Sequence, residues 1–152
     1  MIPLPIRRLP HNPDLPPPTY ASAGAAGMDV RACLPDGPAT LAQGVVIRIP
    51  TGFAFAVPEG YEMQVRARSG LSTREGLILP NAPGTIDGDY RGELFVALLR
   101  MIPGACVLSH GDRIAQLVLA PVARAAPVET DRLGDTARGV GGFGSTGLSD
   151  PA

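Results

Sequence analysis

Residues 61–68 read YEMQVRAR, and this stretch decides the fold class of the chain. Apolar or aromatic residues alternate with charged or amide residues at a period of two, which is the pattern of a β-strand that buries one face. A helix with one buried face would place its apolar residues three and four positions apart. The stretch therefore predicts a strand at the surface of a β-sheet.

Other short stretches that predict β-strands lie before and after this one in the sequence. Residues 45–49 and 53–57 predict two strands divided by a turn at 50–52. The continuously apolar runs 94–99 and 114–119 predict strands buried on both faces. Nineteen glycines and seventeen prolines, spaced at short intervals, supply the turns between strands. The pattern predicts an all-β fold, a jelly-roll-like distorted β-barrel, within one domain.

One short helix and a C-terminal arm complete the predicted organisation. The helix is expected at 70–75, with Ser69 as its N-cap. Residues 1–133 are expected to form the barrel. Residues 134–152 have no apolar face to bury and are expected to form a mobile arm.

Composition limits the partners and the compartment. Thirteen basic residues, all of them arginine, against fourteen acidic ones predict no direct nucleic-acid binding and leave room for a small anionic ligand. Two histidines do not suffice for a zinc site, so any metal is expected to be a hard ion held by oxygen. Cys33 and Cys106 have no metal or redox spacing and are expected to be free thiols in a reducing cytoplasm. No apolar run reaches the length of a membrane span.

The chain near its C-terminus, RGVGGFGSTG at 138–147, is half glycine. Glycine lets backbone N–H groups approach an anion, arginine binds phosphate oxygens, and a lone phenylalanine offers a face on which a base can stack. The segment predicts an arm that closes over a nucleotide polyphosphate, and a flexible tail is the plainer alternative. A Walker-type loop does not fit, because it needs a lysine and the chain has none.

Two clusters before the middle of the chain contain residues suited to nucleotide chemistry, and each also has an ordinary structural explanation. In AGMDVRA (26–32), Asp29 starts a strand after a glycine turn, where acidic residues are usually solvated. In RSGLS (68–72), Arg68 and Ser69 stand where a helix begins. That position favours an anion and equally suits a serine N-cap.

Two later clusters contain more polar and charged residues that a nucleotide site could use. NAPGTIDGDYRGE (81–93) is expected to form a hairpin-like loop that presents two acids and a tyrosine within 87–90, more than a local Asp-Gly turn explains. In GDRIAQLV (111–118), the amide of Gln116 needs hydrogen-bond partners, which phosphate or water could supply.

In order along the chain, AGMDVRA, RSGLS, GTIDGDYRGEL, GDRIAQLV and RGVGGFGSTG resemble the five motifs of the trimeric deoxyuridine triphosphate nucleotidohydrolases, the dUTPases. The resemblance runs from about residue 4 to residue 147, and five motifs in order are far more specific than any one of them. It implies Mg²⁺-dependent hydrolysis of dUTP to dUMP and pyrophosphate. Such a reaction limits uracil incorporation into DNA and supplies dUMP for dTMP synthesis.

The resemblance also implies roles for individual residues. Asp87 resembles the carboxylate that orients and deprotonates the water attacking the α-phosphorus in line. Asp29 resembles the residue that contacts Mg²⁺ through water. Tyr90 resembles the ring beneath the deoxyribose, which leaves no room for a 2′-hydroxyl. Asp112 is expected to orient Arg68 or Arg113.

The remaining implied contacts fall into three sets. Residues that resemble the phosphate-binding set on the barrel are Arg68, Ser69, Gly70 and Gln116. Residues that resemble the uracil pocket are Asn81, Gly84, Thr85 and Ile86. The arm residues are Arg138 at the γ-phosphate, Phe143 stacked on uracil, and Gly144, Ser145 and Thr146 around the substrate.

A homotrimer is implied as well, with each site built from more than one chain and the arm reaching a neighbour's site. Two alternatives stay open. A dCTP deaminase shares the β fold but typically lacks the glycine-rich arm, and it would convert dCTP to dUTP and ammonia. A regulatory module that binds dUTP without hydrolysing it would be favoured by loss of Asp87 or of the arm, and both are present.

Overall fold

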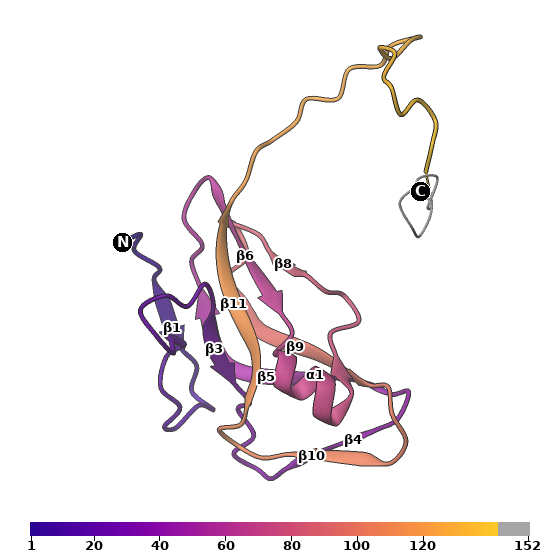
Figure 1. Cartoon of the computed structure of the whole chain (residues 1–152). Coiled ribbons are helices and arrows are strands. Elements are labelled where there is room, and N and C mark those ends of the chain that lie inside the picture. The colour runs from indigo at the N-terminus through magenta and orange to yellow at the C-terminus, as the bar shows by residue number, and fades with distance from the viewer. Residues whose placement is uncertain (143–152) are drawn as a thin grey trace.

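The computed structural model describes residues 1–142, which form β-strands and one short helix (Figure 1). The elements in chain order are β1 (Ile6–Arg8), β2 (Thr19–Tyr20), β3 (Met28–Arg31), β4 (Ala39–Ala42), β5 (Val46–Phe55), β6 (Tyr61–Arg66), α1 (Ser69–Glu75), β7 (Leu77–Ile78), β8 (Gly84–Ile86), β9 (Glu93–Arg100), β10 (Ala105–Leu108) and β11 (Arg113–Pro121).

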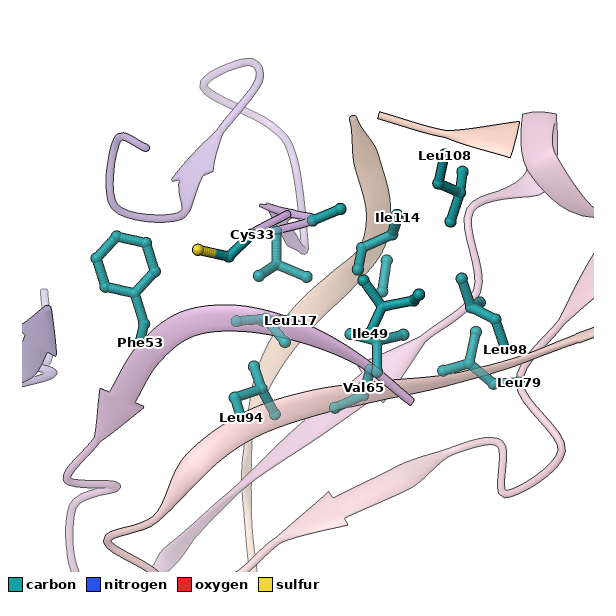
Figure 2. Close-up of a cluster of buried hydrophobic side chains, with 14 of the residues drawn as sticks. Cys33, Ile49, Phe53, Val65, Leu79, Leu94, Leu98, Leu108, Ile114 and Leu117 are labelled. Atoms are coloured by element: carbon teal, nitrogen blue, oxygen red, sulfur yellow. The ribbon is translucent and has the colours of Figure 1, made fainter. Parts of the chain in front are cut away.

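Antiparallel pairing joins these strands into three sheets. The four-stranded sheet has the order β1-β5-β9-β7, the five-stranded sheet has the order β2-β3-β11-β6-β8, and β10 pairs with β4. Apolar side chains from the sheets meet in one core, part of which Figure 2 shows around Ile49, Val65, Leu98 and Leu117. The predicted all-β, jelly-roll-like fold with one short helix is confirmed.

The strand predicted from YEMQVRAR is β6. Met63 and Val65 are buried in the core, whereas Gln64 is half-buried and Arg66 is exposed. The two-residue period therefore identified both the strand and its buried face, because successive side chains of a strand point to opposite sides.

Residues 45–57 contain one strand, β5, instead of the two that were predicted. β5 runs through Pro50 to Gly52, and the register against β9 shifts between Pro50 and Ala54. Gly52 has a φ of 71°, and its carbonyl accepts a hydrogen bond from the Leu9 amide at 2.9 Å. The Pro-Thr-Gly sequence thus produces a bulge that the strand passes through, and it does not end the strand.

β9 is buried on one face only, which corrects the prediction for 94–99. Its inward residues lie in the core, while Phe95 on the outward face is 43 % exposed. Ala97 and Leu99 share that outward face and are half-buried. An apolar outward face on a central strand is unusual for a chain that stays alone.

β11 also departs from the predicted burial on both faces. The register against β3 shifts between Arg113 and Ala115, so the consecutive residues Ile114 and Ala115 are both buried. Beyond this bulge, Gln116 and Val118 are half-buried. The bulge cannot be read from the apolar pattern, because it depends on the partner strand.

The helix lies where it was predicted, but its N-cap is Arg68 and not Ser69. Arg68 has extended backbone angles, and its carbonyl accepts hydrogen bonds from the amides of Leu71 and Ser72. Ser69 is already helical and provides no capping hydrogen bond from its side chain. The cap is therefore made by backbone alone.

Beyond β11 the chain leaves the barrel as an extended segment (Figure 1). Residues 122–142 contain neither helix nor strand and are almost all exposed. Val128 and Leu133 have exposed fractions of 83 % and 81 %. Within the described part, this segment contributes nothing to the apolar core.

We expect Gly52→Ala to destabilise the fold far more than Gly44→Ala. Both glycines have positive φ, so each alanine adds about 1–2 kcal/mol of backbone strain. Nothing lies within 4 Å of a Cβ built on Gly44, whereas a Cβ on Gly52 would overlap the buried side chain of Asn12. That overlap adds about 1–3 kcal/mol. Thermal melting at equal chain concentration measures the difference, and equal melting temperatures would contradict the packing of Asn12 on this bulge.

Candidate active site

Asp29 holds two arginines together at one end of the five-stranded sheet. Its Oδ1 lies 3.2 Å from Arg68 Nε, and its Oδ2 accepts a hydrogen bond from Arg113 Nη1 at 3.0 Å. Arg68 Nη1 also donates to the Arg113 carbonyl at 3.0 Å. Two guanidinium groups against one carboxylate leave a net positive charge, which suits a phosphate.

Neighbouring strands bring other predicted residues to this cluster. Asp29 is the cross-strand partner of Gln116, which in turn is opposite Arg66 on β6. A Cβ on Gly27 would lie 3.1 Å from the Gln116 Cβ, so the glycine of AGMD gives Gln116 its space. Ser69 is exposed at the start of α1 and follows Arg68 directly.

The expectation for Asp112 is wrong. Its Oδ2 accepts a hydrogen bond from the Ser109 amide at 2.8 Å, which closes a local turn. Among the described residues, the carboxylate that pairs with Arg68 and Arg113 is that of Asp29. The turn Ser-His-Gly-Asp satisfies Asp112 locally, as short acidic side chains in turns often are.

The hairpin predicted at 81–93 forms a second cluster on the other edge of the same sheet. β8 pairs with β6, with Thr85 opposite Gln64 and Gly84 opposite Val65. Asp87 comes directly after β8, and its carbonyl accepts a hydrogen bond from the Tyr90 amide at 3.2 Å. A Cβ on Gly84 would lie 3.2 Å from Asn81 Nδ2, so the Asn81 amide rests against this strand.

A cavity of about 260 Å³ opens at this hairpin. Its lining includes Thr85, Ile86, Asp87 and Tyr90, four of the residues to which the resemblance gives a role at the substrate. The residues that the sequence analysis missed are Arg48, Glu93 and Phe95. Asp87 also borders a second cavity of about 1000 Å³, which lies between this loop, the β5–β6 connection with the start of β6, and the chain at the end of β11.

Arg48 could not be found from motif spacing, because it reaches the cavity through strand pairing. It stands on β5, and its guanidinium lies 5.7 Å from the centre of the Phe95 ring on β9. This contact holds a positive charge beside Asp87 and Glu93. Neither Arg48 nor Phe95 lies in a sequence pattern that indicates a site.

The two clusters are well separated within the chain. Asp29 on β3 and Asp87 after β8 are three strand spacings and about four residues apart in the sheet. At about 4.8 Å per spacing and 3.3 Å per residue, this separation is about 20 Å. The structure thus brings Arg68, Ser69 and Gln116 together with Asp29, and it brings Thr85 and Tyr90 together with Asp87 at one cavity. Asn81 lies on the same hairpin, against Gly84.

Of the predicted arm contacts, only Arg138 lies among the described residues. Arg138 is exposed, and its Nε donates a hydrogen bond to the Gly141 carbonyl at 2.8 Å. The predicted contacts Phe143, Gly144, Ser145 and Thr146 lie outside the described residues.

Cys33 and Cys106 are both free and buried. Burial raises the pKa of the Cys33 and Cys106 thiols, so both favour the protonated, unreactive form. Within residues 1–142, no group of three histidine, cysteine or acidic side chains is placed to hold a metal. No helix among the described residues is long and apolar enough to cross a membrane.

Comparison with known proteins assigns the family. The dUTPase family model matches residues 14–147. The chain is 56 % identical over 131 residues to the deoxyuridine 5'-triphosphate nucleotidohydrolase of Desulfotalea psychrophila, covering 86 % of this chain and 87 % of that protein. It is 51 % identical over 153 residues to the enzyme of the same name from Zymomonas mobilis, covering 97 % and 99 %.

Solved structures agree with the fold. A dUTPase variant of Staphylococcus bacteriophage 80alpha with dUpNHpp superposes with a TM-score of 0.81 at 23 % identity, covering 97 % of this chain and 100 % of that chain. A dUTPase variant from phage phi11 of S. aureus, described for its coordination of a structural Mg(II) ion, gives a TM-score of 0.76 at 23 % identity, covering 86 % and 98 %. The family match extends over most of the sequence, from the turn before β2 into the C-terminal arm, and the chain belongs to the dUTPase family.

Proposed function

We propose that this chain hydrolyses dUTP to dUMP and pyrophosphate, with Asp87 as the residue that activates water. The observation that carries the proposal is the position of Asp87, which follows β8 directly and lines the same small cavity as Thr85, Ile86 and Tyr90. A carboxylate on a turn fixed by strand pairing can hold a water in line with a phosphorus atom. It can also accept the proton that this water loses.

The hairpin fits a pocket for a uracil base and a deoxyribose. Backbone N–H and C=O groups of residues 84–86 line the strand edge, and the Asn81 amide rests against Gly84. Such groups can pair with the polar edge of uracil and would leave cytosine with unpaired groups. The Tyr90 ring lines the same cavity and would meet the sugar.

The cluster around Asp29 fits the phosphates and a magnesium ion. Arg68, Ser69, Gly70 and Gln116 would bind phosphate oxygens. Asp29 Oδ1 is buried and ion-paired with Arg68 Nε at 3.2 Å, but it accepts no hydrogen bond within the described part. Mg²⁺ usually keeps several waters and takes other ligands from substrate phosphates, so a single carboxylate reaching it through water fits this donor set. When bound, the ion neutralises charge on the phosphate oxygens.

The separation of the two clusters within one chain supports a trimer whose sites are shared between copies. Asp29 and Asp87 of one chain lie about 20 Å apart along the sheet, so arginines of another copy are better placed to meet a triphosphate held at Asp87. The outward face of the four-stranded sheet also carries exposed apolar residues, among them Val46 and Phe95 with exposed fractions of 52 % and 43 %. Another copy that covers this face could place its Arg68 cluster beside the Asp87 cavity. The arm, residues 134–152, would close over such a shared site, and the enzyme would act in the cytoplasm.

Pyrophosphate release is the experiment that tests the proposed function. We expect the purified chain with Mg²⁺ to release pyrophosphate from dUTP and far less from dCTP, dTTP or UTP under identical conditions. Ammonia release from dCTP would indicate a deaminase instead. Binding of dUTP without release of pyrophosphate would indicate a regulatory module.

A further inference from the structure

The Tyr90 ring is held by Glu93, the first residue of β9, and by Gly92, which directly precedes it. Its hydroxyl donates a hydrogen bond to the Glu93 carbonyl at 2.8 Å. A Cβ on Gly92 would lie 2.5 Å from the Tyr90 hydroxyl oxygen and 2.7 Å from Cζ, so the ring folds back directly over Gly92. Only a residue without a side chain leaves the ring in this place.

The Glu93 side chain is fixed in turn by the bulge in β5. The register shift between Pro50 and Ala54 removes the Gly52 amide from the regular ladder, and this amide donates to Glu93 Oε1 at 2.8 Å. Because the Glu93 carboxylate is only 13 % exposed, this hydrogen bond is shielded from water. The position of the Glu93 backbone therefore depends on its own carboxylate.

The N-terminal segment makes a second contact with the same oxygen. His11 Nε2 lies 3.0 Å from Glu93 Oε1, and the adjacent residue Asn12 is buried against Gly52. Glu93 thus joins three parts of the chain: the N-terminal segment, the β5 bulge and the loop that carries Asp87 and Tyr90.

We propose that Gly92 and Glu93 are positioning residues that set the Tyr90 ring and thereby the preference for deoxyribose over ribose; the inference rests on the proposed function. Glu93 acts through its carbonyl on the tyrosine hydroxyl, and Gly92 acts by leaving room for the ring. A displaced ring would open space where a 2′-hydroxyl could fit. Glu93 also lines the 260 Å³ cavity, so its displacement changes the wall of the sugar pocket itself.

The test is the ratio of kcat/KM for dUTP to kcat/KM for UTP, measured at enzyme concentrations that record the UTP rate. We expect Gly92→Ala and Glu93→Ala each to lower this ratio by about 10-fold or more, because the site no longer excludes the extra hydroxyl. Glu93→Gln should lower it less, because its amide oxygen can still accept the Gly52 N–H. A partial loss of folded enzyme would lower both rates together and leave the ratio unchanged.

Two controls separate positioning from general damage. Asp36→Ala removes an exposed carboxylate on a turn away from this hairpin and should leave the ratio unchanged. In a Tyr90→Ala background, Gly92→Ala and Glu93→Ala should produce no further change in the ratio, because the ring through which they act is gone. If Glu93→Ala fails to fold, Gly92→Ala decides the question, because the three nearest atoms to its added methyl group all belong to Tyr90.

The positioning role is overturned if the wild type hydrolyses dUTP while both variants keep the wild-type ratio. It is also overturned if the ratio falls equally with and without Tyr90. A wild-type chain that releases no pyrophosphate from dUTP would overturn the proposed function instead, so the two failures are distinguishable.

Discussion

Asp87→Asn is expected to lower the turnover of dUTP by about 10²–10⁴-fold, which corresponds to about 3–5 kcal/mol of transition-state stabilisation. Asparagine keeps the shape of the side chain at the end of β8 but cannot accept the proton of the attacking water. The loss should appear in kcat and not in the affinity for dUTP, because the phosphates do not need this carboxylate to bind. Pyrophosphate release under saturating dUTP, with dUTP binding measured separately, checks both statements.

Asp89→Asn is the matched control, because Asp89 lies in the same turn and borders the larger cavity but not the 260 Å³ cavity. It removes the same charge two residues away and should keep most of the turnover. Wild-type turnover in Asp87→Asn, or equal losses in the two variants, would remove Asp87 from the role of the base.

Deleting the chain after Leu133 is expected to abolish most turnover while leaving the fold intact. The barrel should keep its melting temperature, because residues 122–142 are exposed and take no part in the apolar core. The deletion removes Arg138, whose charge-assisted contacts to phosphate are worth about 1.5–3 kcal/mol, or about 10–100-fold in rate. It also removes the predicted ring of Phe143, so water would enter the site and the loss should be larger than Arg138→Ala alone produces.

A shorter deletion serves as the control for the arm. Removing only residues 148–152 keeps every predicted contact, and the family match ends at residue 147, so this variant should stay active. Full activity in the chain that ends at Leu133 would show that the arm is a passive tail.

The local sequence predicted those parts of the fold that depend on neighbouring residues alone. The alternation in residues 61–68 identified β6 and its buried face, because side-chain direction in a strand follows directly from position. The Asp-Gly turn likewise placed Asp87 and Tyr90 on one loop. The bulge at Gly52 and the exposure of the outward face of β9 escaped prediction, because both depend on what packs against the strand and not on its own sequence.

The candidate site was likewise predictable only where it depends on residues that are close together in the sequence. Asp29 and Arg68 were named as site residues in two separate motifs, without a contact between them. Their ion pair, formed in place of the predicted pairing with Asp112, depends on how β3 lies against β11. Arg48 carries no signal in its own segment, because only the pairing of β5 with β9 brings it to the Asp87 cavity. Glu93 lies inside the 81–93 cluster, but the sequence pattern gave it no role.

The central claim is that dUTP is hydrolysed at a site shared between copies. The most direct test measures pyrophosphate release from mixed trimers that contain two different inactive variants. Asp87→Asn and Arg68→Ala are each expected to be nearly inactive alone. After unfolding and refolding together in equal amounts, about a quarter of the sites should combine an intact Asp87 from one chain with an intact Arg68 from another, so about a quarter of the wild-type activity should return. A mixture that forms mixed trimers yet stays as inactive as either variant would contradict the account.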